Sequence, residues 1–205
     1  MAKCGNALGA WLSGGKRAKN GPHHHPGPNR MSADPSAPAY TLLDQLGITR
    51  RTVEHPPVFT VAESQELRGT LPGGHVKNLF TKDKADRFFL ITAEEDSPID
   101  LNATSKLLGT KGRLSFANAE LLREHLGVEP GSVTPLALVN DKAGLVTFIL
   151  EKRLLDHEII NVHPLINSRT TALKREDLLA YIAATGHAVQ VMELPHRVLT
   201  PEQAD

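Results

Sequence analysis

Cysteine is almost absent from this sequence of 205 residues, in which Cys4 is the single one. One cysteine cannot form an internal disulfide, and a chain without disulfides suits a reducing, cytoplasmic setting. Cys4 also lies in a segment that we expect to be disordered, so thiol catalysis is not expected. No apolar run approaches the ~18 residues that a membrane-spanning helix needs. We therefore expect a soluble cytoplasmic protein with no membrane partner.

Net charge is also lacking, because 23 Lys and Arg residues balance 23 Asp and Glu residues. Domains that coat nucleic acid by bulk electrostatics are usually strongly basic, and the composition excludes that mode of binding. Any nucleic-acid partner must therefore be bound locally, through a small basic patch or one end of the molecule.

Several signatures of catalysis and cofactor binding are missing. The sequence has no Gly-x-Ser-x-Gly elbow, no Walker loop, no paired-cysteine metal site and no Gly-x-Gly-x-x-Gly fingerprint after a strand. His23, His24 and His25 are consecutive, but a metal site needs fixed ligands, and the surrounding Pro/Gly-rich segment does not fix them. We expect no metal and no cofactor.

Large apolar side chains are scarce in residues 1–39, where Gly, Pro, Ser, Ala, Asn and basic residues dominate. Too little apolar area is available there to offset the cost of ordering the backbone, so 1–39 is predicted to be a disordered leader. Translation is hypothesised to begin at Met31 rather than Met1, which the intact mass of the native protein would decide. Residues 40–194 are predicted to form one domain, and 195–205 a polar C-terminal tail.

Periodicity and turn residues predict more strands than helices in the domain. Helices are predicted at 40–46, 60–68, 102–108, 118–126 and 175–185. Extended segments are predicted at 51–55, 75–81, 87–92, 113–116, 135–140, 145–150, 154–162, 170–173 and 187–194. Because connections of hairpin length dominate, we predict an α+β fold with a mixed, mainly antiparallel sheet and helices packed on it.

Lys77 and Asn78 are polar residues in an otherwise apolar predicted strand, His75-Val76-Lys77-Asn78-Leu79-Phe80. A partly buried ammonium needs an anion or a carbonyl, so Lys77 is a candidate binder of a phosphate or a polarised carbonyl. The alternative is a solvent-facing lysine. Asn78 should face the opposite side of the strand, for substrate contact or a supporting bond. Gly73 and Gly74 are expected to let a ligand approach the backbone.

Two further segments carry candidate site residues. Gly131-Ser132-Val133-Thr134-Pro135 is a glycine-to-proline loop, predicted to enter an apolar strand and to point free amides into a pocket as a carbonyl cradle. His163 follows another predicted strand. It is a candidate general base or hydrogen-bond donor, with a structural role as the alternative.

These segments together resemble the YbaK/prolyl-tRNA-synthetase-associated editing family, over about residues 40–194. The run from His75 to Phe80, followed by Lys82-Asp83-Lys84, is similar to the free-standing branch that hydrolyses alanyl-tRNA(Pro), called the ProX type, and Asn78 carries that subtype. The resemblance implies a compact, barrel-like α+β domain. It also implies hydrolysis of the ester that joins a wrong amino acid to the terminal adenosine of tRNA.

The resemblance implies roles for individual residues. Lys77 matches the family's essential lysine, Gly131 its glycine-to-proline loop and His163 its histidine at the pocket wall, so these three are predicted to be catalytic. The predicted substrate-binding residues are Asn78, Ser132, Pro135, Arg113, Lys82 and Lys84. The implied partner is the acceptor end of tRNA(Pro) carrying alanine, and prolyl-tRNA synthetase is a second candidate partner.

Physical arguments agree with such an activity. A synthetase that admits proline cannot exclude the smaller alanine sterically, since a missing methylene yields only ~1 to 3 kcal/mol of discrimination. A second, hydrolytic pocket would accept alanine and reject the larger proline ring. Lys82, Lys84 and Arg87 are predicted to form the basic patch, with a solvated hairpin tip as the alternative. Two other functions stay open: a deacylase for cysteine or serine, and a non-catalytic module that binds tRNA or a nucleotide.

Overall fold

The computed structural model describes residues 34–57 and 71–198, which belong to one compact unit. The helix predicted at 60–68 and residues 1–33 of the predicted leader lie outside these ranges. None of the helices in the described ranges is long and apolar enough to cross a membrane.

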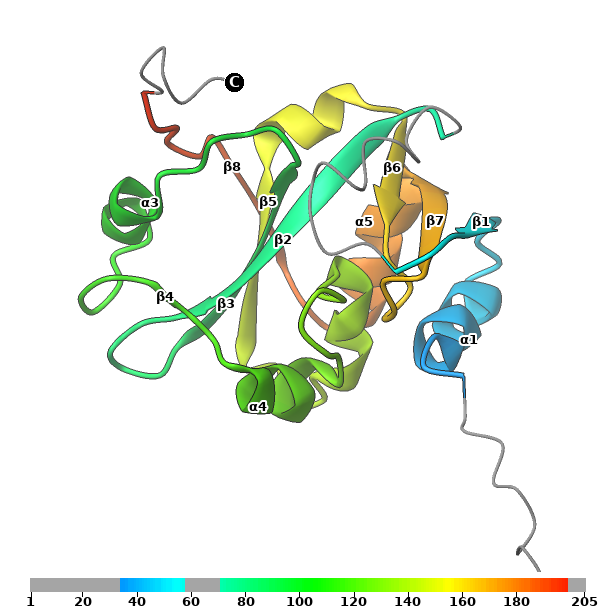
Figure 1. Ribbon diagram of the computed structural model, residues 1–205, viewed down its shortest axis with the longest axis horizontal. Coiled ribbons are helices and arrows are strands. Elements are labelled where there is room, and N and C mark those ends of the chain that lie inside the picture. Colours follow the sequence, from blue (N-terminus) through cyan, green and yellow to red (C-terminus); the bar gives the residue numbers. More distant parts are fainter. Residues whose placement is uncertain (1–33, 58–70, 199–205) are drawn as a thin grey trace, which may run out of the picture. The chain divides into compact units, whose positions relative to one another are not determined.

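Short helices and strands alternate along the described chain (Figure 1). The helices are α1 (Ala37–Gln45), α3 (Leu101–Leu107), α4 (Ala119–Leu121) and α5 (Arg175–Ala184), with a π-helical turn η1 (Leu122–Leu126) and two 3-10 helices, η2 (Pro135–Asn140) and η3 (Lys152–Asp156). The strands are β1 (Arg51–Glu54), β2 (Gly74–Lys82), β3 (Phe88–Glu94), β4 (Ser115–Phe116), β5 (Val146–Glu151), β6 (Ile159–Val162), β7 (Arg169–Lys174) and β8 (Val189–Met192).

The strands form one eight-stranded sheet in the order β1-β7-β6-β2-β3-β5-β8, with β4 paired to the C-terminal end of β2. The pairs β1·β7, β2·β3, β2·β4 and β6·β7 are antiparallel, and β2·β6, β3·β5 and β5·β8 are parallel. The predicted α+β fold with a mixed sheet is therefore confirmed. The β2·β6 contact is short, because it joins only Gly74 to Ile160 and His75 to Asn161.

One sequence prediction fails next to the glycine-to-proline loop. Residues 135–140, predicted as a strand, form η2, which Thr134 caps by accepting a hydrogen bond from the Leu136 amide at 3.3 Å. Pro135 occupies the start of this helix, where its missing N–H costs nothing. A short apolar run cannot be assigned to strand or helix from periodicity alone. The turn beginning at Asp141 therefore links a helix to β5, and does not close a hairpin.

Three other predicted segments differ in extent. The predicted strand 154–162 divides into the end of η3 and the strand β6. The extended piece 113–116 shortens to the two residues of β4. The helix 118–126 begins as α4, capped by the Asn118 side chain, and continues as the π-helical turn η1.

The larger hydrophobic core lies on one face of the sheet, with η2 at its centre. Leu136 and Leu138 of η2 are buried together with Phe148 of β5 and Tyr181 of α5. The Tyr181 hydroxyl donates to the Leu136 carbonyl oxygen at 2.8 Å, which ties α5 to η2. Burial raises the pKa of Tyr181, so its hydroxyl remains the donor. Helices α1 and α5 and the turn η1 all contact η2.

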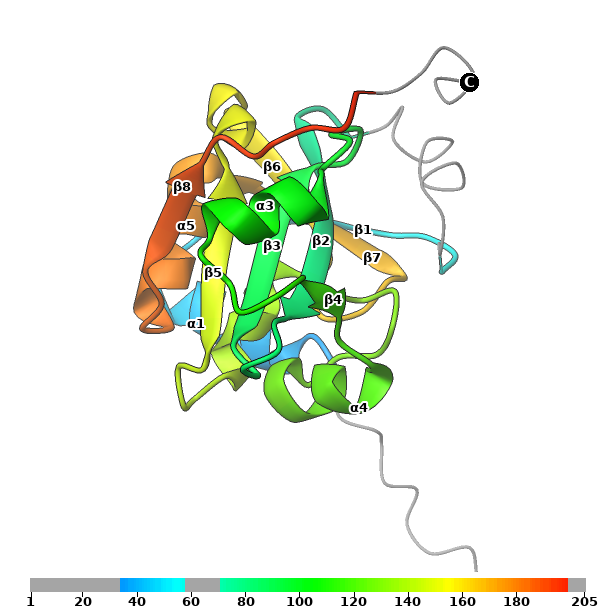
Figure 2. The same ribbon diagram turned by 90° about the vertical axis from the view of Figure 1, so that its left-hand side faces the viewer.

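A smaller core lies on the opposite face of the sheet, under α3. Ile91 of β3 and Ile149 of β5 are buried there, packed against Leu101 and Leu108 at the two ends of α3. Figure 2 shows α3 lying over β3 and β5. Because both faces of the sheet are covered, the side chains of the central strand β2 alternate between two packed environments.

Candidate functional site

Alternation along β2 places Lys77 and Asn78 on opposite faces of the sheet. Val76 and Phe80, which share the face of Asn78, pack in the larger core, whereas Leu79, which shares the face of Lys77, packs in the smaller one. The expectation that these two neighbours face opposite ways is confirmed, and each one reaches a different partner.

The ammonium group of Lys77 is half-buried and bound by the backbone. Its Nζ donates to the carbonyl oxygen of Glu95 at 3.1 Å and to the carbonyl oxygen of Ser97. Since an ammonium has three protons, one remains for a ligand. Burial lowers the pKa of Lys77, while the carboxylates of Glu151 and Asp96 oppose that shift. Lys77 is therefore a hydrogen-bond donor that two backbone carbonyls hold in place, and not a lysine surrounded by solvent.

Gly73 and Gly74 make room for protein, not for a ligand as we expected from the sequence. A Cβ at Gly73 would lie 2.6 Å from the carbonyl oxygen of Ile159, and a Cβ at Gly74 would lie 2.6 Å from the His157 ring. Both contacts are too close for any side chain. The glycine pair thus allows β2 to start against β6.

Asn78 joins the lysine strand to the glycine-to-proline loop. Its Nδ2 donates to the Val133 carbonyl oxygen at 3.0 Å, and its Oδ1 accepts from the Thr92 hydroxyl at 2.7 Å. The second bond fixes the orientation of the carboxamide, because Thr92 donates to the oxygen and leaves the nitrogen for Val133. The two segments, 55 residues apart in the sequence, are thereby brought together.

The glycine-to-proline loop turns at Gly131, where φ is 86°. Only glycine adopts this backbone conformation without strain. The Ser132 amide donates to the Glu129 carbonyl oxygen at 3.0 Å, whereas within the described residues the Val133 amide makes no backbone hydrogen bond. Ser132 and Pro135 are buried. The loop is thus anchored on both sides of Val133.

His163 is the first residue after β6, the strand that lies beside the start of β2. The last β2·β6 pair joins His75 to Asn161, two positions before Lys77 and two before His163. The Nδ1 atom of His163 lies 2.9 Å from the Arg169 carbonyl oxygen. A carbonyl oxygen only accepts, so Nδ1 carries the proton, and Nε2 is left as an acceptor in the neutral ring.

Burial lowers the pKa of His163, and the nearby His55 adds to that shift, while the bond to Arg169 opposes it. The unfolded chain therefore binds a proton more readily than the folded protein below pH about 6.5. We expect His163 to cost stability progressively as the pH falls below that value. Urea unfolding of the wild type and of His163→Asn, which can keep the bond to Arg169, should show a stability difference that changes between pH 7.5 and 5. A constant difference would contradict the burial of a neutral ring.

The predicted basic patch of Lys82, Lys84 and Arg87 lies at the far end of β2, and the structure brings the segment of Lys111 and Arg113 beside it, so these five residues together are the basic patch from here on. Asp83 organises it: the buried carboxylate accepts hydrogen bonds from the amides of Ala85, Arg87 and Lys111 and from the Arg87 guanidinium. Burial opposes the charged form of Asp83, but these hydrogen bonds outweigh it and lower the pKa.

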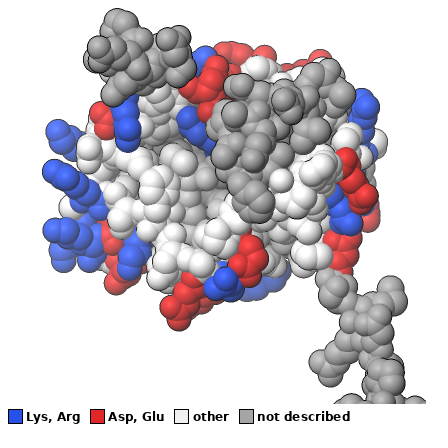
Figure 3. All heavy atoms as spheres, in the orientation of Figure 1, with Lys and Arg blue, Asp and Glu red and all other residues white. Residues whose placement is uncertain are grey.

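Two members of the basic patch are neutralised locally and three are not. Lys82 pairs with Asp86 at 2.8 Å, and Arg87 with Asp83 at 2.7 Å. Lys84, Lys111 and Arg113 are exposed and have no carboxylate partner among the described residues. Figure 3 shows basic side chains gathered along one edge of the molecule, on the side of α3 and the β2–β3 connection. The patch is therefore available to an anionic partner.

The structure divides the predicted site residues into two groups. Asn78 of β2 is joined to the loop 131–135, Lys77 beside it faces the other side of the sheet, and His163 follows β6, the strand paired with the start of β2. Lys82, Lys84 and Arg113 lie at the other end, with Lys82 ~17 Å from Lys77 at the usual rise along a strand. Sequence reasoning missed Glu151 and Ser97, which support Lys77. Glu151 could have been noticed, because it is an acidic residue directly after the apolar run 145–150.

Residues 55–181 match the model of the aminoacyl-tRNA editing domain. The matched segment makes up more than half of the chain. The chain belongs to the aminoacyl-tRNA editing domain family. This match confirms the resemblance drawn from the sequence.

Named relatives point the same way. The chain is 42% identical over 149 residues to the prolyl-tRNA synthetase associated domain-containing protein 1 of Mus musculus, covering 71% of this chain and 88% of that protein. It is 33% identical over 165 residues to the prolyl-tRNA editing protein ProX of Acetoanaerobium sticklandii, covering 80% and 100%. A solved structure, described as a candidate trans-editing enzyme for prolyl-tRNA synthetase, is similar with a TM-score of 0.63 and 23% identity, covering 80% of this chain and 99% of that chain. That likeness shows the fold.

Proposed function

We propose that this chain is a trans-editing hydrolase that deacylates alanyl-tRNA(Pro). Family membership supports an editing activity, and the names of the relatives support tRNA(Pro) as the substrate. The observation that carries the proposal is the Asn78–Val133 hydrogen bond, which holds the glycine-to-proline loop against the strand of Lys77. A backbone donor that is already in place is what a developing oxyanion requires.

The reaction is hydrolysis of the ester between alanine and the terminal ribose. Water adds to the ester carbonyl carbon, the bond from that carbon to the ribose oxygen breaks, and the ribose oxygen takes up a proton. The products are alanine and uncharged tRNA, with no oxidant or further reactant. The negative charge that develops on the carbonyl oxygen needs a donor that is already in place, and such a donor contributes roughly 2.7 to 4 kcal/mol.

Each residue has a proposed part in this reaction. Lys77 uses its remaining proton to fix the terminal phosphate or sugar, and the loop at Gly131 supplies a backbone donor to the carbonyl oxygen. His163, neutral at pH 7, offers Nε2 as an acceptor at the pocket wall. The substrate's own ribose hydroxyl or a held water is proposed to complete the proton transfer.

Separately charged tRNA(Pro) tests the proposal. The protein is incubated with tRNA(Pro) carrying alanine, cysteine, serine or proline, and loss of the ester is followed over time. We expect rapid loss of alanine and a stable prolyl ester, since the pocket excludes the larger ring. A stable alanyl ester would overturn the proposal. Faster loss of cysteine or serine would reassign the substrate, and binding without hydrolysis would indicate a non-catalytic module.

The basic patch is proposed to bind tRNA phosphates away from the ester. We expect the double variant Lys82→Gln/Lys84→Gln to reduce the slope of log affinity against log salt by about one to two. Lys152→Gln, outside the patch and paired with Glu193, is the matched control. An unchanged slope in the double variant would reject the patch.

A further inference from the structure

Glu151 ends β5 with its carboxylate behind the turn that holds Lys77. Glu151 is buried, with 1% of its surface exposed. Oε2 accepts from the Glu94 amide at 2.8 Å, and both carboxylate oxygens accept from the Ser97 hydroxyl, at 2.8 and 2.9 Å. Burying a charge is costly unless hydrogen bonds compensate it, and these bonds do so. The carboxylate therefore fixes the first and last residues of the 94–97 turn.

Ser97 connects this carboxylate to Lys77. Its side chain is buried and its hydroxyl binds Glu151, while its carbonyl oxygen accepts from the Lys77 ammonium. The Ser97 amide closes the turn by donating to the Glu94 carbonyl oxygen at 3.1 Å. Glu95, whose carbonyl oxygen is the other acceptor of Lys77, lies inside the same turn. Both acceptors of the Lys77 ammonium thus belong to the segment that Glu151 holds.

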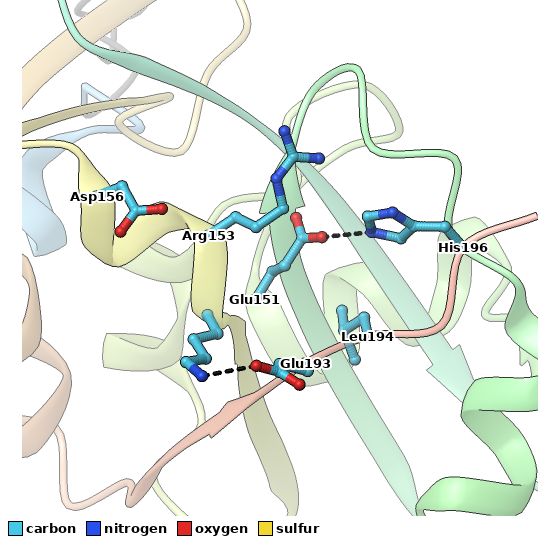
Figure 4. Close-up of a pocket in the computed structure, with 7 residues that line it drawn as sticks. Glu151, Arg153, Asp156, Glu193, Leu194 and His196 are labelled. Atoms are coloured by element: carbon cyan, nitrogen blue, oxygen red, sulfur yellow. Dashed lines mark hydrogen bonds and ion pairs between the residues drawn. The ribbon is translucent and has the colours of Figure 1, made fainter.

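Residues of η3 and of the C-terminal segment also bind Glu151 or the 94–97 turn (Figure 4). Arg153 of η3 pairs with the Glu94 carboxylate at 2.8 Å and donates to the Ser97 hydroxyl oxygen at 3.3 Å. His196 Nε2 lies 2.7 Å from Oε1 of Glu151, and its segment pairs by a backbone bridge with Ile99. In Figure 4 the Glu151 carboxylate lies between Arg153 and His196. The C-terminal segment is therefore linked to the support of Lys77.

We propose that Glu151 is a positioning residue for the proposed deacylation, because it fixes the 94–97 turn and thereby the place of the Lys77 ammonium. Its charge has a second effect, since the Glu151 carboxylate favours the protonated form of Lys77 against the effect of burial. The inference rests on the proposed function for its chemical meaning, but the state of Lys77 is measurable without any substrate. Among the described residues, the charged and titratable groups on the elements around Lys77 include His75 of β2, Glu94, Glu95 and Asp96 of the turn, Glu151 of β5, Arg153 and His157 at η3, and His196 of the C-terminal segment.

Glu151→Gln separates charge from shape. Glutamine keeps a side-chain oxygen as acceptor for Glu94 and Ser97, but it removes the negative charge. By NMR titration of carbon-13 labelled lysine, with Lys77→Arg to assign the signal, we expect the Lys77 pKa to fall in the variant. The alkaline limb of the deacylation rate should move to lower pH, and kcat should fall by at least about 10-fold with KM for the tRNA within about 2-fold.

Asp141→Asn is the matched control, because Asp141 is also a buried carboxylate bound by backbone amides and a histidine, His187. It should lower stability and leave the Lys77 pKa and the alkaline limb unchanged. Should Glu151→Gln fail to fold, Ser97→Ala, which removes only the connecting hydroxyl, is expected to change kcat in the same direction. A folded variant with an unchanged Lys77 pKa and unchanged kcat would overturn the inference. If the wild type deacylates nothing but Glu151→Gln still lowers the Lys77 pKa, the proposed function is refuted and the positioning of Lys77 by Glu151 is supported.

Discussion

Lys77→Ala is expected to lower kcat/KM for deacylation of alanyl-tRNA(Pro) by at least about 100-fold, because Lys77 is proposed to fix the terminal phosphate or sugar and a misplacement of about 1 Å costs that much. The structural reason is that Nζ is already held by the Glu95 and Ser97 carbonyls, so its remaining proton is aimed before substrate arrives. Rapid-quench or filter-based measurement of ester loss, at several tRNA concentrations, gives the rate.

Stability must be measured beside activity, because the same substitution leaves two buried carbonyl oxygens with fewer donors. We expect a loss of ~1 to 3 kcal/mol in the free energy of unfolding. Lys77→Arg, which restores a positive charge of different shape, should recover stability better than activity. Lys152→Ala, outside both the site and the basic patch, is the control for a general loss of positive charge. Wild-type deacylation by a folded Lys77→Ala variant would remove Lys77 from the site.

Asn78→Ala should give the next largest effect, a fall of roughly 10- to 100-fold in kcat/KM. It breaks the bond to the Val133 carbonyl oxygen, so the loop at Gly131 is no longer held against β2, and a displacement of about 1 Å is enough for a loss of that size. The same assay with alanyl-tRNA(Pro) measures it.

Two variants around Asn78 isolate the bond to the loop. Thr92→Val removes the donor to Oδ1 and leaves the Val133 bond in place, so it should reduce activity less than Asn78→Ala. Asn78→Asp places a carboxylate opposite a carbonyl oxygen, where the two acceptors repel, and should be as damaging as alanine. Full activity in Asn78→Asp would show that the loop does not depend on this contact.

The strands of the sheet could be predicted because their signal is local. Apolar alternation and the polar turn after Lys82 gave β2 and β3 as a hairpin, and the structure pairs them from Val76–Glu94 to Lys82–Phe88. η2 could not be predicted in the same way. Five of its six residues are apolar, and its identity depends on the Thr134 cap and on packing against α5, whose Tyr181 lies 45 positions after Leu136.

In the candidate site, too, local features could be predicted and contacts between distant residues could not. The positions of Lys77 and Asn78 on opposite faces followed from the period of a strand. The acceptors of Lys77 did not, because carbonyl oxygens carry no sequence signature and the turn that presents them is held by Glu151, 54 residues from Ser97. The catalytic and binding roles of the predicted residues stay predictions until the variants are measured.

The two-residue contact between β2 and β6 has a mechanical consequence. It divides the sheet into a β1-β7-β6 half, which carries His163, and a β2-β3-β5-β8 half, which carries Lys77. So short a ladder leaves much of the connection between the halves to helix packing, because α5 contacts β6 and β7 of one half and β8 of the other. The Tyr181–Leu136 bond, which ties α5 to η2, therefore helps to hold the Lys77 half and the His163 half together, although neither residue belongs to the sheet.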